Sequence, residues 1–428
     1  MHPLLEFSYG MLARAAEAAA ARVPADAAAA KWRRALAARR GLAERVQAFA
    51  PHRDRSRPLG WFHAPSVGET LMALPVLRDL RASQHPPQLA ITWYSPSAES
   101  FARRIDADFH DYLAFDTREA AVRALGALAP TALVYAKLDV WPVLTEEAAR
   151  KGVKLGLIAA SLSSRSSRLG RTARALLTDA YAALDAVGAV GPEDAERLVR
   201  LGVRHSAITV TGDTRYDQVW DRVQGIDRTA EPLRKLLSDR PTVVAGSTWP
   251  SDEHPLLRAW ERVRVRVPGA RLIIAPHEPT SAHVGTIRAW GQGIGARTAT
   301  LGQEAAASAE VVIVDRVGVL AELYAVGTAA FVGGGFHRAG LHSVLEPAAL
   351  SLPVAFGPNW WSSRDAAGLV AIGAGASKHG PEPLARVFES WLTDRVGSAE
   401  IGKRGSAFVR GGLGAAKRTL QVVEHLLS

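Results

Sequence analysis

Three consecutive glycines, Gly333, Gly334 and Gly335, follow directly after the short apolar run AAFV. A run of this kind predicts a buried strand, and open α/β sheets bind ligands at the carboxyl ends of their strands. Glycines at such an edge let a ligand approach the backbone closely. Three glycines at a strand end are also typical of a tight turn, and the stretch has neither a GxGxxG fingerprint nor a Walker lysine.

The residues after the glycines add groups that suit a nucleotide. His342, Ser343 and Glu346 lie within the segment GLHSVLEP. Ser343 is expected to cap a helix, whose N-terminal N–H groups would receive a phosphate. The carboxylate of Glu346, one turn into that helix, would take the hydroxyl pair of a ribose. His342 on its own is also explained as a hydrogen-bonded residue at the helix start.

A second carboxylate stands at a predicted helix start nearer the N-terminus. The run GWFHA (60–64) predicts a strand, and the segment PSVGET then leads into an amphipathic helix. Ser66 is expected to cap this helix, with Glu69 in its first turn. A carboxylate there ordinarily belongs to a capping box or faces the helix dipole, and the functional alternative is a general base.

The elements that position these groups alternate between strand and helix along most of the chain. Besides AAFV and GWFHA, apolar runs that predict strands occur at 89–95, 132–135, 154–170, 208–219, 242–245, 271–275, 311–314 and 353–356. Such alternation predicts an α/β protein with parallel sheets covered by helices on both faces. A chain of 428 residues is long enough for two domains of this kind.

Charge is concentrated at the N-terminal end. The chain carries 52 Lys and Arg against 42 Asp and Glu, a net charge of +10, and residues 1–60 hold eleven basic and five acidic residues, or +6 of that excess. An anionic partner is therefore expected. The absence of cysteine excludes disulfides, thiolate metal sites and cysteine nucleophiles. No HExxH motif or other metal-ligand spacing is present.

Two helices are predicted at 3–24 and 31–46. Neither holds the roughly 20 apolar residues of a membrane span, and no basic segment precedes the first apolar stretch, so neither a span nor a cleaved signal peptide is expected. The basic second helix, with Trp32 at its start, would suit an anionic membrane surface. A pair of packed, solvated helices is the competing interpretation.

Over about residues 60–425, the order of several motifs resembles that of the 3-deoxy-D-manno-octulosonic acid (Kdo) transferases. These motifs are SVGE at 66–69, DRVGVLAELY, AAFVGGGF, LEPA and PVAFGP. The resemblance implies a GT-B fold, with two Rossmann-like, doubly wound parallel-sheet domains and an interdomain cleft. It implies an inverting, metal-independent glycosyltransferase without a cofactor. Such an enzyme moves Kdo from CMP-Kdo to a lipid A precursor in lipopolysaccharide inner-core synthesis.

The resemblance also sets the expected organisation and location. We expect a basic helical segment over 1–58 as a surface anchor, an acceptor domain over 59–225, a CMP-sugar domain over 226–410 and a C-terminal helix over 411–428 that packs back across the domains. The location implied is the cytoplasmic face of the bacterial inner membrane, with the protein peripheral or monotopic on its anionic surface.

The resemblance assigns roles to particular residues. It makes Glu69 the general base. The acceptor-binding residues would be Ser66, Lys137, Asp139, Ser163 and Arg165. The donor-binding residues would be Ser247, Thr248, Pro276, His277, Gly333, Gly334, Gly335, His342, Ser343 and Glu346. The chain departs from the family pattern at Lys137 and Asp139, which replace two glutamates, at Trp249 and Leu341, which replace histidine and glycine, and at His277, where a phosphate-binding arginine is usual.

Three alternatives stay open from the sequence. The departures at Lys137, His277 and Leu341 are compatible with a GT-B transferase or epimerase that acts on another nucleotide sugar. A basic nucleic-acid-binding protein would fit the charge, but the chain has no RNP, helix-turn-helix or interleaved aromatic pattern, so no nucleic acid is expected. A catalytically inactive membrane-associated scaffold is the third, and the presence of Glu69 and Glu346 counts against it.

Overall fold

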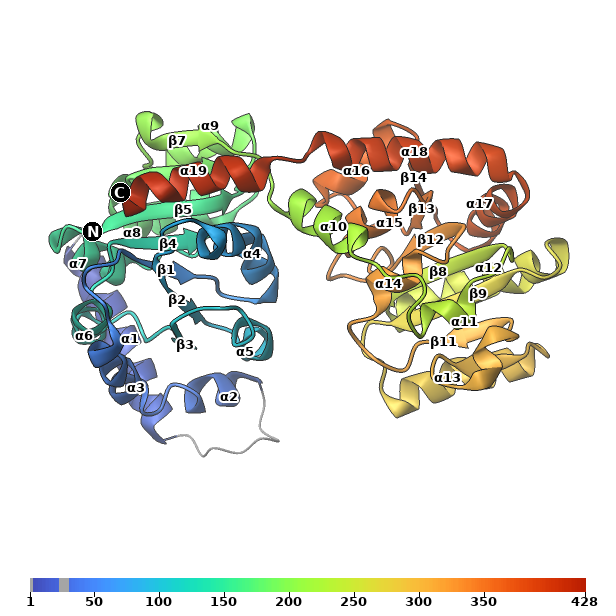
Figure 1. Cartoon of the computed structure of the whole chain (residues 1–428), viewed down its shortest axis with the longest axis horizontal. Helices are drawn as coiled ribbons and strands as arrows, with labels where there is room; N and C mark the ends of the chain where they lie inside the picture. Colours follow the sequence, from blue (N-terminus) through green and yellow to red (C-terminus); the bar gives the residue numbers. More distant parts are fainter. Residues whose placement is uncertain (1–2, 23–30) are drawn as a thin grey trace. The chain divides into compact units, whose positions relative to one another are not determined.

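The computed structural model describes residues 3–22 and 31–428, and the chain forms two compact units (Figure 1). The first unit consists of Met1–Gln218 and Leu413–Ser428, and the second of Val219–Gly412. The chain passes from the first unit to the second within helix α10 (Arg215–Gln224), a few residues before the boundary expected near 225.

The first unit is built on a seven-stranded parallel sheet in the order β3-β2-β1-β4-β5-β6-β7. The chain runs outward from β1 to β3, then crosses to β4 and runs outward on the other side. The strand order therefore reverses between β1 and β4, which is where open α/β sheets bind ligands. The strands are β1 (Leu59–His63), β2 (Gln88–Trp93), β3 (Phe109–Tyr112), β4 (Ala132–Ala136), β5 (Lys154–Ala160), β6 (Ala186–Ala189) and β7 (Ile208–Val210).

Helices cover both faces of this sheet. One apolar core packs α3 and α6 to α9 on one face, and another packs α4, α5 and the C-terminal helix α19 on the other. The α-helices of this unit are α1 (Pro3–Arg22), α2 (Lys31–Ala37), α3 (Leu42–Phe49), α4 (Val67–Ala82), α5 (Pro96–Ala102), α6 (Arg118–Leu128), α7 (Pro142–Arg150), α8 (Arg171–Ala182), α9 (Pro192–Leu201) and α19 (Ala415–Leu427). The 3-10 helices are η1 (Ala50–His52), η2 (Ser167–Leu169) and η3 (His205–Ala207).

The predicted helix over 31–46 is wrong as a single element. Helix α2 ends at Ala37 and α3 begins at Leu42, because Gly41 between them adopts a φ of 62°, a left-handed conformation that favours glycine. The apolar residues of α3 (Leu42, Val46 and Phe49) are buried in the core of the unit. This part of the basic N-terminal segment is thus an integral layer of the first unit.

The second unit repeats the architecture with the order β10-β11-β9-β8-β12-β13-β14, all parallel. Here the strand order reverses between β8 and β12. The strands are β8 (Thr242–Thr248), β9 (Arg271–Pro276), β10 (Thr298–Thr300), β11 (Val311–Ile313), β12 (Ala329–Val332), β13 (Val354–Phe356) and β14 (Gly375–Ser377).

The helices of the second unit again lie on both faces of the sheet. Helices α12, α13 and α17 share one apolar core with the strands, and α11 and α14 share the other. Besides α10, the helices are α11 (Leu233–Leu236), α12 (Pro250–Arg266), α13 (Ser281–Gly293), η4 (Glu304–Ala307), α14 (Leu320–Tyr324), α15 (Leu345–Ala349), α16 (Arg364–Ala371), α17 (Pro381–Thr393) and α18 (Arg395–Gly411).

Several predicted boundaries change in the structure. The expected strand over 154–170 ends at Ala160, and the one over 208–219 ends at Val210. The helix expected to start at Ser343 has Val344 as its N-cap and is only five residues long, although the Ser343 hydroxyl accepts a hydrogen bond from the Leu345 N–H (3.4 Å). Among the described residues, no helix is long and apolar enough to cross a bilayer.

Candidate functional site

Glu69 and Lys137 meet at the carboxyl edge of the first sheet, where the strand order reverses. Glu69 lies in the first turn of α4, shortly after β1, and Lys137 directly follows β4. Since β1 and β4 are parallel neighbours, their ends lie side by side, and Lys137 Nζ is 3.0 Å from Glu69 Oε1. The Ser66 hydroxyl donates a hydrogen bond to Glu69 Oε2. Three of the predicted site residues therefore form one cluster.

The surroundings of Glu69 keep its carboxylate charged. Its side chain is only 12% exposed, and this burial acts to raise its pKa, but the hydrogen bond from Ser66 and the charge of Lys137 outweigh it. The net result is a pKa of Glu69 below its usual range. Both carboxylate oxygens already accept a hydrogen bond, yet each oxygen has a second lone pair for another donor. The carboxylate is therefore an ionised acceptor at neutral pH.

Lys137 holds its position through an unusual backbone conformation. Its φ is +65°, in the left-handed region that non-glycine residues seldom adopt, and its N–H donates to the carbonyl of Ile158 at 2.8 Å. Such strain persists where the surrounding structure fixes it, and it is frequent at functional sites. The conformation directs the ammonium group to Glu69.

Asp139 lies in a second cluster close by in the sequence. Its Oδ2 is 3.0 Å from Nε2 of the buried His63 and accepts a hydrogen bond from the Trp141 indole at 3.0 Å. Burial acts to raise the pKa of Asp139, but His63, Trp141 and the charge of Arg168 together lower it. The Thr92 hydroxyl lies 3.1 Å from Nδ1 of the same imidazole and so fixes the ring from its other side.

The sequence analysis missed His63 and chose Arg165 rather than Arg168. His63 lies within the run GWFHA that predicts a strand, where a histidine gives no sign of a distant partner. Only the register of β1 and β4 brings it to Asp139. Ser163 and Arg165 are exposed on the loop after β5, where the Ser163 hydroxyl accepts a hydrogen bond from the Arg165 N–H (3.3 Å). The arginine of this loop that acts on Asp139 is Arg168.

The three glycines of the second unit are required by packing between backbone segments. A Cβ on Gly333 would lie under 3.0 Å from the backbone of Ser247, and one on Gly335 under 3.0 Å from that of Gly357. Gly334 has a φ of +91°. The glycines thus allow the ends of β8, β12 and β13 to pack closely, and the space beside them is filled by protein backbone.

Asp252, which the sequence analysis did not select, holds this glycine loop in place. It is fully buried near the start of α12 and accepts hydrogen bonds from the N–H groups of Gly334 (2.7 Å), Phe336 (2.8 Å) and Trp249 (2.9 Å). These donors are therefore occupied by a carboxylate. In this structure the Gly334 N–H therefore points to Asp252.

Four aromatic rings stack at the carboxyl edge of the second sheet. His337 lies on Trp249 (centroids 4.5 Å apart), Trp249 on His277 (4.4 Å) and His277 on His342 (4.7 Å). The Trp249 indole also donates to Nε2 of His342 at 3.1 Å. Burial, followed by the charges of His277 and His337, lowers the pKa of His342. Two predicted residues, His277 and His342, are thus brought together by a tryptophan that departs from the family pattern.

The remaining predicted donor residues have different surroundings. The Thr248 hydroxyl is buried and donates to Glu253 (2.7 Å), Ser247 has a φ of +54°, and Pro276 is the buried last residue of β9. Ser343 is exposed. Of these groups, Thr248 is committed to a protein partner and the Ser343 hydroxyl is open to solvent.

Glu346 lies apart from the ring stack in a cluster of charges. Its carboxylate is 3.7 Å from the guanidinium of Arg222, and Glu322 lies on the other side of that arginine at 3.6 Å. Burial raises the pKa of Glu346, Arg222 acts to lower it and Glu322 to raise it, with a net rise. Among the residues that the structure describes, no three His, Asp or Glu side chains gather as metal ligands.

Comparisons with known proteins find similarity to one family. Residues 36–218 match the family model of the 3-deoxy-D-manno-octulosonic-acid transferases (kdotransferases). The chain is 29% identical to the 3-deoxy-D-manno-octulosonic acid transferase of Bordetella pertussis over 92% of this chain and 95% of that protein, and 26% identical to that of Haemophilus influenzae over 91% and 92%. The chain is thus similar to Kdo transferases over most of its length. The resemblance inferred from the motifs is confirmed.

Solved structures show the same fold. UDP-GlcNAc 2-epimerase from Neisseria meningitidis, with UDP-GlcNAc bound, matches with a TM-score of 0.62 at 14% identity and covers 86% of this chain and 99% of that one. An enzyme described as a UDP-N-acetylglucosamine 2-epimerase from Listeria monocytogenes matches with a TM-score of 0.61. The predicted GT-B type α/β fold, with two doubly wound parallel-sheet units, is confirmed.

Proposed function

We propose that this protein is a glycosyltransferase that moves Kdo from CMP-Kdo to a lipid A precursor in lipopolysaccharide inner-core synthesis. Similarity to Kdo transferases over most of the chain supports Kdo transfer. The observation that carries the catalytic assignment is the ionised Glu69 at the carboxyl edge of the first sheet, hydrogen-bonded to Ser66 and Lys137.

In the proposed mechanism, Glu69 removes the proton from the attacking hydroxyl of the acceptor. A base must be unprotonated before it acts, and Ser66 and Lys137 keep Glu69 so at neutral pH. Both partners also fix the orientation of the carboxylate. Asp139, held by His63 and Trp141, offers a second carboxylate for hydroxyl groups of the acceptor. We assign Ser163 and Arg165, on the exposed loop after β5, to its anionic groups.

The second unit is proposed to hold CMP-Kdo. We assign three groups to the leaving phosphate: His277, Ser343 and the N–H of Gly335. Six further residues shape their surroundings: Ser247, Thr248, Pro276, Gly333, Gly334 and His342. We assign Glu346 to the ribose hydroxyls. Stabilisation by such fixed donors would let transfer proceed without a metal ion.

We further propose that helix α1 and the start of α2 lie on the anionic inner surface of the bacterial inner membrane. Met11 and Leu12 are 56% and 72% exposed on α1, and Trp32 on α2 is 58% exposed. Arg33 lies against the Trp32 ring, with its guanidinium carbon 5.2 Å from the ring centroid. Exposed apolar residues beside basic ones are typical of helices that lie in a membrane interface.

The membrane proposal is tested by sedimentation with phosphatidylglycerol vesicles. Binding should weaken as salt rises, because screening reduces attraction to the anionic surface. Leu12→Asp should weaken it further, whereas Val199→Asp, at an exposed apolar residue of α9, should not. Point substitutions are used rather than deletion of residues 1–50, because that deletion would also remove the buried core residues of α3. Binding that ignores both salt and Leu12→Asp would contradict the proposal.

The function itself is tested by incubating the full chain with freshly made CMP-Kdo and a tetra-acylated lipid A precursor in EDTA. Mass spectrometry should show product that gains whole Kdo units. Absence of product together with retained CMP binding would indicate another CMP-sugar or acceptor, and would direct attention to Lys137 and His277. Absence of CMP binding would overturn the donor assignment.

A further inference from the structure

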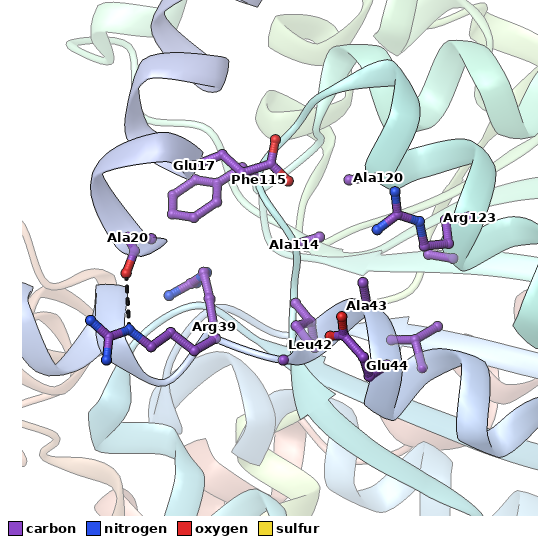
Figure 2. A pocket seen from close by; sticks show the side chains of 14 residues that line it. Glu17, Ala20, Arg39, Leu42, Ala43, Glu44, Ala114, Phe115, Ala120 and Arg123 are labelled. Atoms are coloured by element: carbon purple, nitrogen blue, oxygen red, sulfur yellow. Dashed lines mark hydrogen bonds between the residues drawn. The ribbon is translucent and has the colours of Figure 1, made fainter. Parts of the chain in front are cut away.

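A pocket of about 330 Å³ lies in the first unit where α1, α3 and α6 meet (Figure 2). Helix α1 contributes Glu17 and Ala20, and the other sides come from the α2–α3 turn, α3, the segment after β3 and α6. These elements cover the face of the sheet opposite α4, so the pocket is distinct from the cluster around Glu69. Its volume is that of a site for a small organic ligand.

The walls of the pocket are apolar and continue inward. A second, narrow cavity of about 20 Å³ shares six of the lining residues and reaches Trp61 and Leu144 in the core. The shared residues are Leu42, Val46, Ala114, Phe115, Ala120 and Ala124. Small and aliphatic side chains predominate, and Phe115 is the one aromatic ring among the lining residues. A wide pocket lined mainly by small and aliphatic side chains fits a linear chain better than a planar ring.

The rim carries arginines that form no ion pair within the described chain. Arg123 has no polar partner there, and Arg40 uses only its Nε, which donates to the Ala20 carbonyl at 3.3 Å (dashed line in Figure 2). Glu17 and Glu44 also line the pocket, and Glu17 accepts a hydrogen bond from Thr117. Two guanidinium groups are thus available to an anionic head group.

The wall adds a third guanidinium. Arg39 is 7% exposed and donates to the carbonyls of Leu113 (2.9 Å), Ala35 (2.6 Å) and Tyr94 (3.0 Å), with no carboxylate among these partners. All of its hydrogen-bond acceptors are therefore neutral carbonyl groups. Together with Arg40 and Arg123 it gives the pocket three positive charges against the two negative charges of Glu17 and Glu44, which favours an anionic ligand.

Helix α1 connects this pocket to the proposed membrane face. Three contacts hold α1 beside the start of α6: Tyr9 donates to Asp116 (2.8 Å), Arg14 pairs with Glu119 (3.0 Å) and Glu17 accepts from Thr117 (3.4 Å). The same helix exposes Met11 and Leu12 to solvent. One side of α1 therefore closes the pocket while its exposed apolar residues remain free to meet lipid.

We propose that this pocket binds one acyl chain of an anionic lipid, with the head group at Arg40 and Arg123. The proposal rests on the proposed function only in that the enzyme works on a lipid. A chain held here would tether the enzyme to lipid at a point separate from Glu69. The ligand chemistry, a saturated chain with a carboxylate or phosphate, is shared by free fatty acids and phospholipids.

The test uses the full chain and two probes: myristate with a terminal diazirine in solution, and phosphatidylglycerol with the same group on one chain in vesicles. After irradiation, peptide mapping should place the cross-links of one or both probes in residues 39–46 and 114–124, and the probe that labels more strongly identifies the source. Affinity for unlabelled fatty acids should rise about fourfold for each added methylene until the pocket is full.

Variants make the test specific. Ala43→Phe fills the pocket, and a ring that displaces two methylenes should weaken myristate binding about fifteenfold. Ala48→Phe is the matched control, because Ala48 lies on the exposed side of α3 and does not line the pocket. Arg123→Gln should weaken binding, whereas Arg174→Gln, on α8 and outside the pocket, should not. Thermal unfolding of each variant checks that it folds.

The outcomes separate this proposal from the proposed function. Glu69→Gln should bind myristate as the wild type does, since Glu69 lies outside the pocket. Cross-links spread over other surfaces, affinity independent of chain length, or equal binding by Ala43→Phe and Ala48→Phe would overturn the acyl-chain site even if Kdo transfer is observed. Pocket-specific labelling without Kdo transfer would leave the acyl-chain site standing and count against the proposed function.

Discussion

The pair of Lys137 and Glu69 gives a prediction whose size follows from geometry. Two unit charges at the observed 3.0 Å interact by about 1.4 kcal/mol in water and about 5.5 kcal/mol at an effective dielectric of 20. The lower value applies because the Lys137 side chain is 45% exposed and screened by solvent. Removing the ammonium in Lys137→Met therefore makes protonation of Glu69 easier by about 1.4 kcal/mol, a factor of about ten in proton concentration.

The consequence is a shift in the pH dependence of transfer. Loss of the cation raises the pKa of Glu69, so the acid limb of the kcat/KM profile should move to higher pH by about one unit. Lys137→Arg keeps the charge and should leave the limb in place. The plateau at higher pH is free to fall if Lys137 also binds acceptor, so the position of the limb is the decisive quantity. An unmoved limb in Lys137→Met, or a limb displaced to lower pH, would refute this reasoning.

Two predictions concern the second unit. Asp252→Asn should lower the free energy of unfolding by about 2–4 kcal/mol in denaturant titrations, because one of the two buried oxygens that accept these three N–H bonds is then replaced by an amide donor. Stability within error of wild type would show that the glycine loop is held by other contacts. Gly335→Ala should cost about 1–3 kcal/mol, since its Cβ would meet the backbone of Gly357. The control is Gly285→Ala, because a Cβ at this position of α13 meets open space, and it should stabilise the protein by up to about 1 kcal/mol. Equal free energies of unfolding for the two variants would contradict the packing role of Gly335.

The sequence predicts the fold well because its physical signals are local. Strands buried on both faces appear as short apolar runs, and β1, β9, β11, β12 and β13 each coincide with such a run. The C-terminal helix expected within 411–428 is found at Ala415–Leu427. The error in predicting one helix over 31–46 also has a local cause. Helix-favouring residues lie on both sides of Gly41, but the left-handed conformation of Gly41 interrupts the helix.

The candidate site is predicted less completely because its contacts are not local. Glu69 and Lys137 are 68 positions apart and meet only through the pairing of β1 with β4. The glycines were interpreted as a ligand cradle, whereas their partners Ser247 and Gly357 come from neighbouring strand ends. Asp252 looked like an ordinary acidic residue in the first turn of a helix, and nothing in its immediate sequence points to the distant loop that it holds.

The central claim is that Glu69 acts as the base for Kdo transfer. The most direct measurement is single-turnover transfer from CMP-Kdo to a tetra-acylated lipid A precursor by Glu69→Gln, beside wild type and the exposed control Glu193→Gln. We expect Glu69→Gln to fold and bind CMP-Kdo as the wild type does, and to transfer Kdo about two to four orders of magnitude more slowly. Glu193→Gln should behave as wild type. Transfer by Glu69→Gln at a rate close to that of Glu193→Gln would contradict the assignment of Glu69 as the base.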